Sequence, residues 1–507
     1  MKSTADSQHL RNSGRNLEVP FRLFLKSDGS SVELICESIA RIIPGKRLVC
    51  IGKWNDKPVV VKIFLSPKSA GRHCDREIKG VNALKNAGIK TPALLFQGNL
   101  LQDGTPLLVF ERIIPAHNPQ EAVLKAKTDE KRCELLKQIT VVIAEQHETG
   151  LKQKDLHLGN FLLSGNDIYT IDGDTVDTRQ MGTPLPKAKS MKNIGLYFAQ
   201  FDSNFDHLFF AVFQVYAGKR SWHADKSLFN DLLKEVKFQR KNRKKKYLNK
   251  IFRECTAFVC HKSWNSHMVC DRNFYYGEMK KLIADLDSAI DANRLLKDGN
   301  SSTVALAKVN NKLLVVKRYN IKNFIHALKR CARNTRAWSS WRNAHRLESL
   351  GIPTPKPIAF FEKRCGPFRS TSYYISEYID GTDLYRLITS DKSKEISIEV
   401  LSKRFGKILK SLADACMSHG DFKATNFIVT EDRLFIIDIE GMKEYRLKWR
   451  FKKALKRDCE RFMRNWEGMP KVARIFQDKI KLFMMPAGIE YSIFLLNCGC
   501  LYLLHLT

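Results

Sequence analysis

The chain has 507 residues, of which 44% are hydrophobic. This length excludes a single hydrophobic core and suits two domains of about 250 residues, for which the apolar content is sufficient. The 86 Lys and Arg residues exceed the 53 Asp and Glu residues by 33 charges, which favours anionic partners such as nucleic acid, acidic lipid or phosphorylated sugar and indicates no fold.

The N-terminal 21 residues contain no apolar h-region, so we expect no secretory signal and a protein on the cytoplasmic side. The 13 cysteines have no regular spacing, and reduced thiols are the simplest interpretation. One group contains metal-ligand residue types: Cys260, His261, His267 and Cys270. Its spacing matches no common zinc site, so packing is the favoured interpretation over metal binding.

The first half begins with a predicted hairpin. Two runs rich in β-branched residues, 47–54 and 57–65, flank a polar turn, and the second run contains Lys62. The stretch 72–88 has apolar residues near helical spacing and ends at a glycine, which predicts a helix carrying Glu77. Two further strands and a helix are expected at 91–99, 106–113 and 134–150.

A spaced set of polar residues then occurs twice in the chain. The first set is Asp155, Asn160 and Asp172, and the second is Asp421, Asn426 and Asp438. Each residue of the second set lies 266 positions after its counterpart (421 − 155, 426 − 160 and 438 − 172). A repeat of this length with the same chemistry predicts a duplicated domain.

The second half repeats the order of the predicted elements. Strands are expected at 302–309 and 312–319, with Lys317 in the latter, before a helix at 336–351 and strands at 357–361 and 373–381. The seam is expected near 285–295, after a helical stretch and without a flexible linker. The predicted domains are therefore 1–290 and 291–507, the second ending in an apolar tail.

These patterns predict an α+β fold with two tandem protein-kinase-like domains. Each would have a small antiparallel β-sheet N-lobe with one helix, and a mainly helical C-lobe. In phosphoryl transfer a strand lysine contacts the nucleotide phosphates, a helix glutamate holds that lysine, and an Asn and an Asp bind magnesium. A G-x-G-x-x-G loop is absent from both halves, so nucleotide binding depends on the other positions.

The candidate residues follow from these roles. Lys62, Glu77 and Lys317 are the candidates for ATP binding. Asp155 and Asp421 are the candidates to orient or deprotonate the acceptor hydroxyl. The expected Mg²⁺ ligands are Asn160, Asp172, Asn426 and Asp438.

The motifs resemble a known family. QKDLHLGNFLL followed by IDGD, and HGDFKATNFIV followed by IDIEG, are similar to the lipopolysaccharide core kinases, which phosphorylate heptose or Kdo sugars of the bacterial outer-membrane core. GIKTP and GIPTP, at the ends of the predicted helices, also match that family. The likeness covers residues 40–180 and 295–445. It implies a protein-kinase-like fold, ATP and Mg²⁺, and transfer to a sugar hydroxyl on a membrane-anchored glycolipid.

The two copies match the family pattern unequally. In the first copy, Gln153 stands two residues before the candidate catalytic Asp, where many kinases have His. In the second copy, the position expected for the helix glutamate is Ser340, and Glu348 lies about 12 Å further along the helix at 1.5 Å per residue. We therefore expect Lys317 to be less well ordered, and the second copy to be a slower kinase or a pseudokinase scaffold.

The chain ends in an apolar segment. Its uncharged part, Tyr491–Leu506, is shorter than the roughly 20 residues needed to span a bilayer, so a core helix or a membrane-surface contact is favoured. The basic excess fits peripheral attachment to the anionic cytoplasmic face of the inner membrane. The densest basic run, 240–246, is interpreted as a solvated helix face in preference to an anion-binding surface.

The leading hypothesis is an ATP- and Mg²⁺-dependent kinase that phosphorylates heptose or Kdo in the inner core of lipopolysaccharide. A protein kinase is disfavoured because no APE-like ending follows Asp172 or Asp438. A small-molecule kinase and a tandem pseudokinase scaffold remain alternatives. No specific nucleic acid partner is expected, because no nucleic-acid-binding signature is present. The sequence leaves the acceptor hydroxyl and the oligomeric state open.

Overall fold

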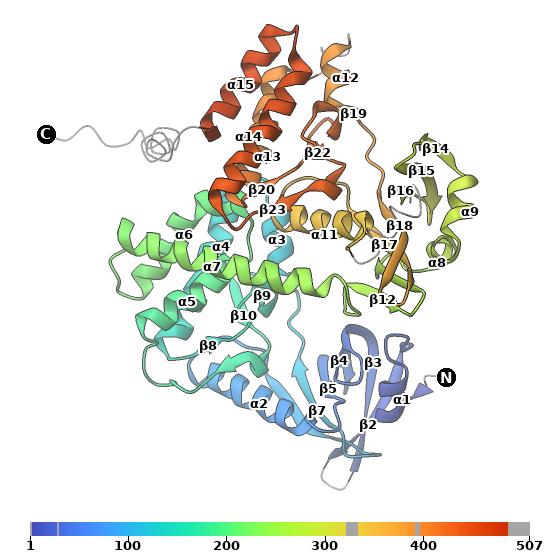
Figure 1. Ribbon diagram of the computed structural model, residues 1–507. Coiled ribbons are helices and arrows are strands. Elements are labelled where there is room, and N and C mark those ends of the chain that lie inside the picture. Colours follow the sequence, from blue (N-terminus) through green and yellow to red (C-terminus); the bar gives the residue numbers. More distant parts are fainter. Residues whose placement is uncertain (1–2, 28–29, 321–332, 391–395, 485–507) are drawn as a thin grey trace, which may run out of the picture. The chain divides into compact units, whose positions relative to one another are not determined.

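The computed structural model describes residues 3–27, 30–320, 333–390 and 396–484 (Figure 1). The chain divides into two compact units, Met1–Arg243 and Lys244–Thr507. The apolar segment Tyr491–Leu506 lies outside the described residues, so its predicted contact stays a prediction. Within the described ranges, no helix has both the length and the apolar character that crossing a membrane requires.

The first unit contains a seven-stranded sheet in the order β1-β2-β3-β4-β5-β7-β6, and β2 also pairs with β6. The β1–β2 pair is parallel and the other pairs are antiparallel. Its strands are β1 (Ser3–Thr4), β2 (Phe21–Ser27), β3 (Ser30–Ile43), β4 (Arg47–Trp54), β5 (Lys57–Phe64), β6 (Leu94–Leu100) and β7 (Pro106–Glu111). Two helices accompany the sheet, α1 (Ser7–Asn12) and α2 (Ala70–Asn86).

The predicted hairpin is confirmed as β4 and β5, and the predicted helix as α2. Burial alternates along β5, as expected for a pleated strand: Val59, Val61 and Ile63 are fully buried in a core on one face of the sheet. Phe64 belongs to a second cluster, which also contains Val81 of α2. The helix therefore packs on the sheet through apolar side chains, and this fixes Glu77 relative to β5.

The remainder of the first unit is mainly helical. A cluster of buried aromatic and aliphatic side chains, including Phe198, Phe209 and Phe213, forms its core. Its helices are α3 (Pro119–Lys125), α4 (Asp129–Glu148), α5 (Lys187–Phe198), α6 (Phe209–Lys219) and α7 (Lys226–Lys250), the last of which continues past the unit boundary. Short strands form the pairs β8–β11 (Lys152–Gln153 with Val176–Asp177) and β9–β10 (Phe161–Ser164 with Asp167–Thr170).

The basic run 240–246 lies on α7 and is only partly a solvated face. Arg240 donates to the Phe201 carbonyl at 3.0 Å and to the Asp206 carboxylate at 2.5 Å. Burial lowers the pKa of the Arg243 guanidinium, while Asp155 acts in the opposite direction. Some cations of this run are therefore buried or form hydrogen bonds within the first unit.

The second unit also contains a seven-stranded sheet, in the order β12-β13-β17-β18-β16-β15-β14. Its strands are β12 (Phe258–Lys262), β13 (Ser266–Asp271), β14 (Arg294–Lys297), β15 (Ser302–Val309), β16 (Lys312–Tyr319), β17 (Pro357–Cys365) and β18 (Phe368–Glu377). The sequence places the domain boundary at 290, whereas the compact units divide between Arg243 and Lys244. The reason is that β13 pairs with β17, so this earlier hairpin belongs to the second sheet.

The Cys/His group of the sequence lies on the β12–β13 hairpin. The Cys260 sulfur is 3.7 Å from His267 Nε2, and burial raises the pKa of the Cys260 thiol. Across the described part of the chain, no group of three or more His, Cys, Asp or Glu side chains is arranged to hold a metal ion. His267 and Cys270 of this hairpin are buried in the second unit.

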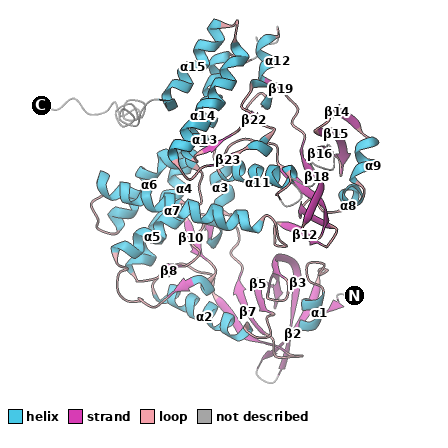
Figure 2. Ribbon diagram, in the orientation of Figure 1, coloured by secondary structure: helices cyan, strands magenta, loops and turns pink. Residues whose placement is uncertain are grey.

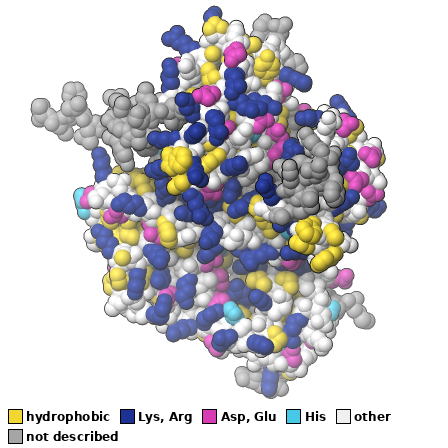
Figure 3. Space-filling model, viewed as in Figure 1, with side chains coloured by type: hydrophobic (Ala, Val, Ile, Leu, Met, Phe, Trp, Pro, Cys, Tyr) yellow, Lys and Arg dark blue, Asp and Glu magenta, His cyan; other side chains and the backbone are white. Residues whose placement is uncertain are grey.

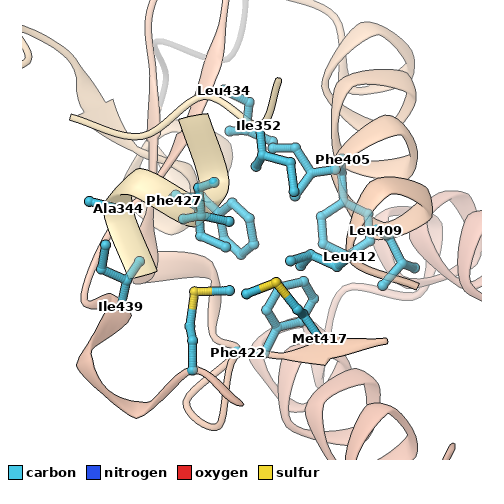
Figure 4. Close-up of a cluster of buried hydrophobic side chains, with 14 of the residues drawn as sticks. Ala344, Ile352, Phe405, Leu409, Leu412, Met417, Phe422, Phe427, Leu434 and Ile439 are labelled. Carbon is cyan, nitrogen blue, oxygen red and sulfur yellow. The ribbon is translucent and has the colours of Figure 1, made fainter. Parts of the chain in front are cut away.

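The remaining elements of the second unit surround a core that Figure 4 shows, where Phe405, Phe422 and Phe427 point toward one another. The helices are α8 (Gly277–Ala284), α9 (Leu286–Asp291), α11 (Arg336–Ser349), α12 (Leu384–Thr389), α13 (Ile398–Asp414), α14 (Lys448–Met463) and α15 (Pro470–Met484). Short strands are β19 (Thr382–Asp383), β20 (Met417–Ser418), β21 (Phe427–Val429), β22 (Leu434–Ile436) and β23 (Lys443–Glu444). Strands and helices segregate as Figure 2 shows, which confirms the α+β class.

Candidate functional site

In the first unit, a buried glutamate holds the candidate lysine. Lys62 Nζ on β5 donates to Glu77 Oε1 on α2 at 2.5 Å, and the Glu77 side chain is fully buried. The same carboxylate accepts hydrogen bonds from the backbone N–H groups of Gly173 at 3.0 Å and Asp174 at 3.1 Å. Glu77 therefore fixes the lysine and the turn after Asp172 together, and these bonds compensate for burying its charge.

Two glycines permit this arrangement. A Cβ atom on Gly80 of α2 would lie 2.0 Å from the Gly173 carbonyl oxygen, and a Cβ on Gly173 would lie 2.4 Å from the Glu77 carbonyl oxygen. Helix and turn thus meet backbone to backbone, and a side chain at either glycine would separate them. The close approach brings the buried carboxylate within reach of the two N–H groups.

Asp172 sits at this turn with its backbone in the left-handed region, at φ 70° and ψ 68°. Its Oδ1 lies 3.9 Å from Lys62 Nζ and 3.7 Å from Arg47 Nη1. Asp174 is also engaged, accepting from Arg76 Nε at 2.7 Å. The structure therefore brings Lys62, Glu77 and Asp172 together, as the sequence predicts.

The other candidates of the first unit lie on the loop between β8 and β9. Asn160 Nδ2 donates to the Asp155 carbonyl at 2.7 Å and to Gln153 Oε1 at 3.0 Å. Both bonds use the amide nitrogen, so neither occupies the Asn160 Oδ1 atom. The Asp155 side chain is 71% exposed, with His157 Nε2 at 3.8 Å. Its carboxylate is therefore accessible to a reactant.

A buried network supports this loop. Asn193 of α5 donates from Nδ2 to the Gln153 carbonyl at 2.8 Å, and its Oδ1 lies 2.9 Å from His147 Nε2. The other His147 nitrogen, Nδ1, is 2.7 Å from the Tyr216 hydroxyl. These contacts anchor the candidate catalytic loop to the helical core. The sequence patterns did not predict them.

The second unit also pairs its lysine with a carboxylate, but from a different element. Lys317 Nζ on β16 contacts Asp438, and it donates to Glu440 Oε2 at 3.1 Å. Glu440 follows Asp438 by two residues, as Asp174 follows Asp172. It also accepts from Arg336 Nη2 of α11 at 2.6 Å. A loop glutamate thus holds the lysine where the first unit uses a helix glutamate.

Ser340 indeed occupies the inward-facing helix position, since it is buried and its Oγ lies 2.7 Å from the Tyr319 hydroxyl. The helix glutamate is absent, as the sequence predicts, but Lys317 still has a glutamate partner because Glu440 contacts it from the segment after Asp438. The available signal was the acidic residue two positions after the motif Asp in both copies. Counting positions along the helix alone misses it.

The second candidate loop has the same backbone support and a more enclosed acid. Asn426 Nδ2 donates to the Asp421 carbonyl at 2.7 Å, as Asn160 does to Asp155. Arg461 Nη2 lies 2.5 Å from Asp421 Oδ1, and Lys423 Nζ lies 3.3 Å from Oδ2. Ion pairs therefore occupy both carboxylate oxygens of Asp421, in contrast to Asp155.

Asp438 matches Asp172 in conformation and lies in a cationic environment. Its backbone is left-handed, at φ 58° and ψ 46°. Burial would raise the pKa of Asp438, but Lys317 outweighs it and holds that pKa at about 2. The carboxylate is thus anionic at neutral pH, which is the state required of a cation ligand.

Asp458 is a further residue that sequence reasoning missed. From α14 it accepts hydrogen bonds from the backbone N–H groups of His419 at 2.7 Å and Gly420 at 3.0 Å, directly before Asp421. Asp458 follows Asn193 by 265 positions (458 − 193), nearly the spacing of the repeated motif. In each unit, a polar side chain from a helix therefore supports the loop: Asn193 from α5 and Asp458 from α14.

Comparison with known proteins adds one finding. Residues 293–482 match the family model described as the Lipopolysaccharide kinase (Kdo/WaaP) family. This confirms the motif resemblance for that part of the chain and supports phosphotransferase activity. No curated protein matches the chain.

The network around His147 generates a pH prediction. Burial lowers the pKa of His147 to about 4 from an ordinary value near 6.5, so between these values the unfolded state binds a proton that the folded state excludes. The first unit should lose roughly 3 kcal/mol of stability as pH falls through this window. Thermal melts of wild type and His147→Asn between pH 7 and pH 4 test this: the variant should show the smaller decrease.

The exposed His223 provides the control, because His223→Asn removes a histidine without touching the buried network. Its melting temperature should follow the wild-type pH dependence. Equal pH dependence in His147→Asn and wild type would contradict the assignment of the effect to this buried imidazole.

Proposed function

From the family that residues 293–482 match, we propose that the chain is an ATP- and Mg²⁺-dependent kinase with two tandem protein-kinase-like units. Its acceptor is a heptose or Kdo hydroxyl in the inner core of lipopolysaccharide. The observation that carries the proposal is present in both units: a strand lysine held by a carboxylate beside a left-handed Asp. This is the arrangement that positions nucleotide phosphates in phosphoryl transfer.

The residues present fit ATP and Mg²⁺. Lys62 and Lys317 offer ordered ammonium groups for phosphate oxygens. Magnesium prefers oxygen ligands, which Asn160 and Asp172 in the first unit, and Asn426 and Asp438 in the second, would supply. The backbone joins each pair, because Ile171 N–H donates to the Asn160 carbonyl at 2.8 Å and Ile437 N–H to the Asn426 carbonyl at 2.9 Å. When bound, ATP supplies the γ-phosphoryl group.

The first unit is the stronger candidate for turnover. The exposed Asp155 carboxylate is free to accept the proton of a sugar hydroxyl, which general-base assistance requires. In the second unit, Arg461 and Lys423 pair with Asp421, and a reactant must displace these contacts. This observation favours a second candidate role for that unit, as a nucleotide-binding scaffold without turnover.

Surface chemistry supports the proposed location. Figure 3 shows many Lys and Arg side chains on the face in view, as expected from the net charge of +33. At the start of α14, Leu447 and Trp449 are 48% and 63% exposed beside Lys448, Arg450 and Lys452. An exposed Trp among cations suits an anionic membrane surface, so we place the protein at the cytoplasmic face of the inner membrane, where the core glycolipid is presented.

Mass spectrometry of lipopolysaccharide core tests the activity. Cells that depend on the wild-type chain should carry one core phosphate that Asp155→Asn removes, because the amide cannot accept the hydroxyl proton. Loss in Asp421→Asn instead would assign turnover to the second unit. Asp56→Asn is the matched control, since Asp56 lies in a hairpin turn at φ 59°, a conformation Asn tolerates. An unchanged core in both single variants and the double variant would exclude the sugar-kinase function.

Removing the glutamate at position 440 and introducing one at position 340 tests how Lys317 is held in the second unit. With Lys62→Met silencing the first unit, Glu440→Gln should weaken ATP binding by about tenfold, because a charge-assisted bond to Lys317 is lost. Ser340→Glu in that background should restore binding, since position 340 already touches Tyr319, a neighbour of Glu440. Equilibrium binding of a fluorescent ATP analogue measures both. Unchanged affinity in Glu440→Gln would show that Glu440 does not order the lysine.

Vesicle binding tests the membrane surface. Vesicles rich in phosphatidylglycerol should retain the chain, whereas Trp449→Ser should weaken retention about fivefold by removing exposed apolar area. Trp264, which is 70% exposed on the hairpin after β12, provides the control variant Trp264→Ser. Equal loss in the two variants would mean that the start of α14 has no special part in binding.

A further inference from the structure

The second unit contains a cavity of about 280 Å³ that the proposed transfer reaction does not use. It lies between α11 and the segment after Glu440, and Figure 1 shows α11 beside β23. Its walls include Trp338, Arg342, Arg346, Lys443, Glu444 and Tyr445. The wall thus combines three cations and two aromatic rings with a single carboxylate.

The charges of this cavity are unbalanced. Arg342 and Arg346 lie one turn apart on α11, and like charges at this spacing repel each other and destabilise a helix. Glu444 already contacts Lys244 at 2.8 Å and Arg346 at 3.5 Å. Lys443 adds a further positive charge to the wall. The protein therefore concentrates cations at one site beyond what its own carboxylate neutralises.

Arg346 shows the cost of this arrangement. The residue is 9% exposed, and its Nε atom is buried without a hydrogen-bond partner among the described residues. Burial lowers the pKa of the Arg346 guanidinium, and the Arg342 charge lowers it further. A buried guanidinium close to another cation is unfavourable unless an anion compensates for it.

The cavity walls are held in place before any ligand arrives. Asn343 Nδ2 donates to the Ile439 carbonyl at 2.8 Å and to the Met442 carbonyl at 3.2 Å, which ties α11 to the neighbouring segment. The Arg342 guanidinium lies over the Trp338 ring, 5.2 Å from its centroid. The Arg342–Trp338 contact and the Asn343 hydrogen bonds hold the cavity side chains in place, which reduces the entropy lost when a ligand binds.

We propose that this cavity binds a dianionic phosphate group. The guanidinium groups of Arg342 and Arg346 offer paired N–H donors that match phosphate oxygens, and Lys443 adds a point charge from the opposite wall. A dianion between α11 and β23 joins the helix to the segment that follows Asp438 and Glu440. Binding here therefore stabilises the second unit and requires no turnover at Asp421.

Calorimetric titration of the full chain tests the site. The ligands are inorganic phosphate and glucose 1-phosphate, at constant ionic strength and with ADP present to fill any nucleotide site. Arg342→Gln and Lys443→Gln should each raise the dissociation constant about tenfold, because each removes a charge-assisted contact. Both positions are more exposed than Arg346, so these variants leave the buried guanidinium in place. Lys407→Gln, which removes an exposed cation on α13, is the matched control and should bind like the wild type.

The outcomes separate the sources of phosphate. Tighter binding of glucose 1-phosphate identifies a phosphate carried on a sugar, and equal binding identifies free phosphate; both results support the site. Wild-type affinity in Arg342→Gln and Lys443→Gln would overturn it. An equal loss in Lys407→Gln would also overturn it, because attraction by net charge alone would then explain the binding.

Discussion

The carboxylate of Glu77 is fully buried, and a buried charge is costly unless opposite charge and hydrogen bonds compensate it. Lys62 and the two N–H groups after Asp172 provide that compensation. The strand lysine, the helix and the left-handed turn consequently form one unit, since displacing the lysine or the turn removes part of this compensation. The geometry of the first site depends on this interaction.

The second unit satisfies the same constraint from another direction. Glu440 replaces Glu77 as the carboxylate that meets the lysine, and Arg336 of α11 supplies the balancing cation. Once the loop carries the charge, the helix position is available for Ser340, which bonds to Tyr319 instead. The requirement is for a carboxylate near the lysine, and the chain meets it from whichever element approaches closely enough.

The two loops that carry Asp155 and Asp421 are supported alike but exposed differently. Asn193 braces one through a backbone carbonyl, and Asp458 braces the other through two backbone N–H groups. Asp155 projects into solvent, whereas cations cover Asp421. The two loops thus share a backbone framework but differ in the accessibility of the carboxylate, because side chains near each loop differ without altering the backbone bonds.

Local sequence patterns were sufficient to predict the strands and helices around the site. The strands of Lys62 and Lys317, the helices α2 and α11, and the repeated Asp and Asn positions follow from periodicity and spacing, because neighbouring residues impose both. The sequence by itself therefore determined the order of the elements, the repeat and the candidate residues. Only the tertiary structure decided that Glu440 meets Lys317, that Asp458 supports the Asp421 loop, and that β12 and β13 join the second sheet. These contacts join residues distant in sequence, whose partners are set by packing in three dimensions.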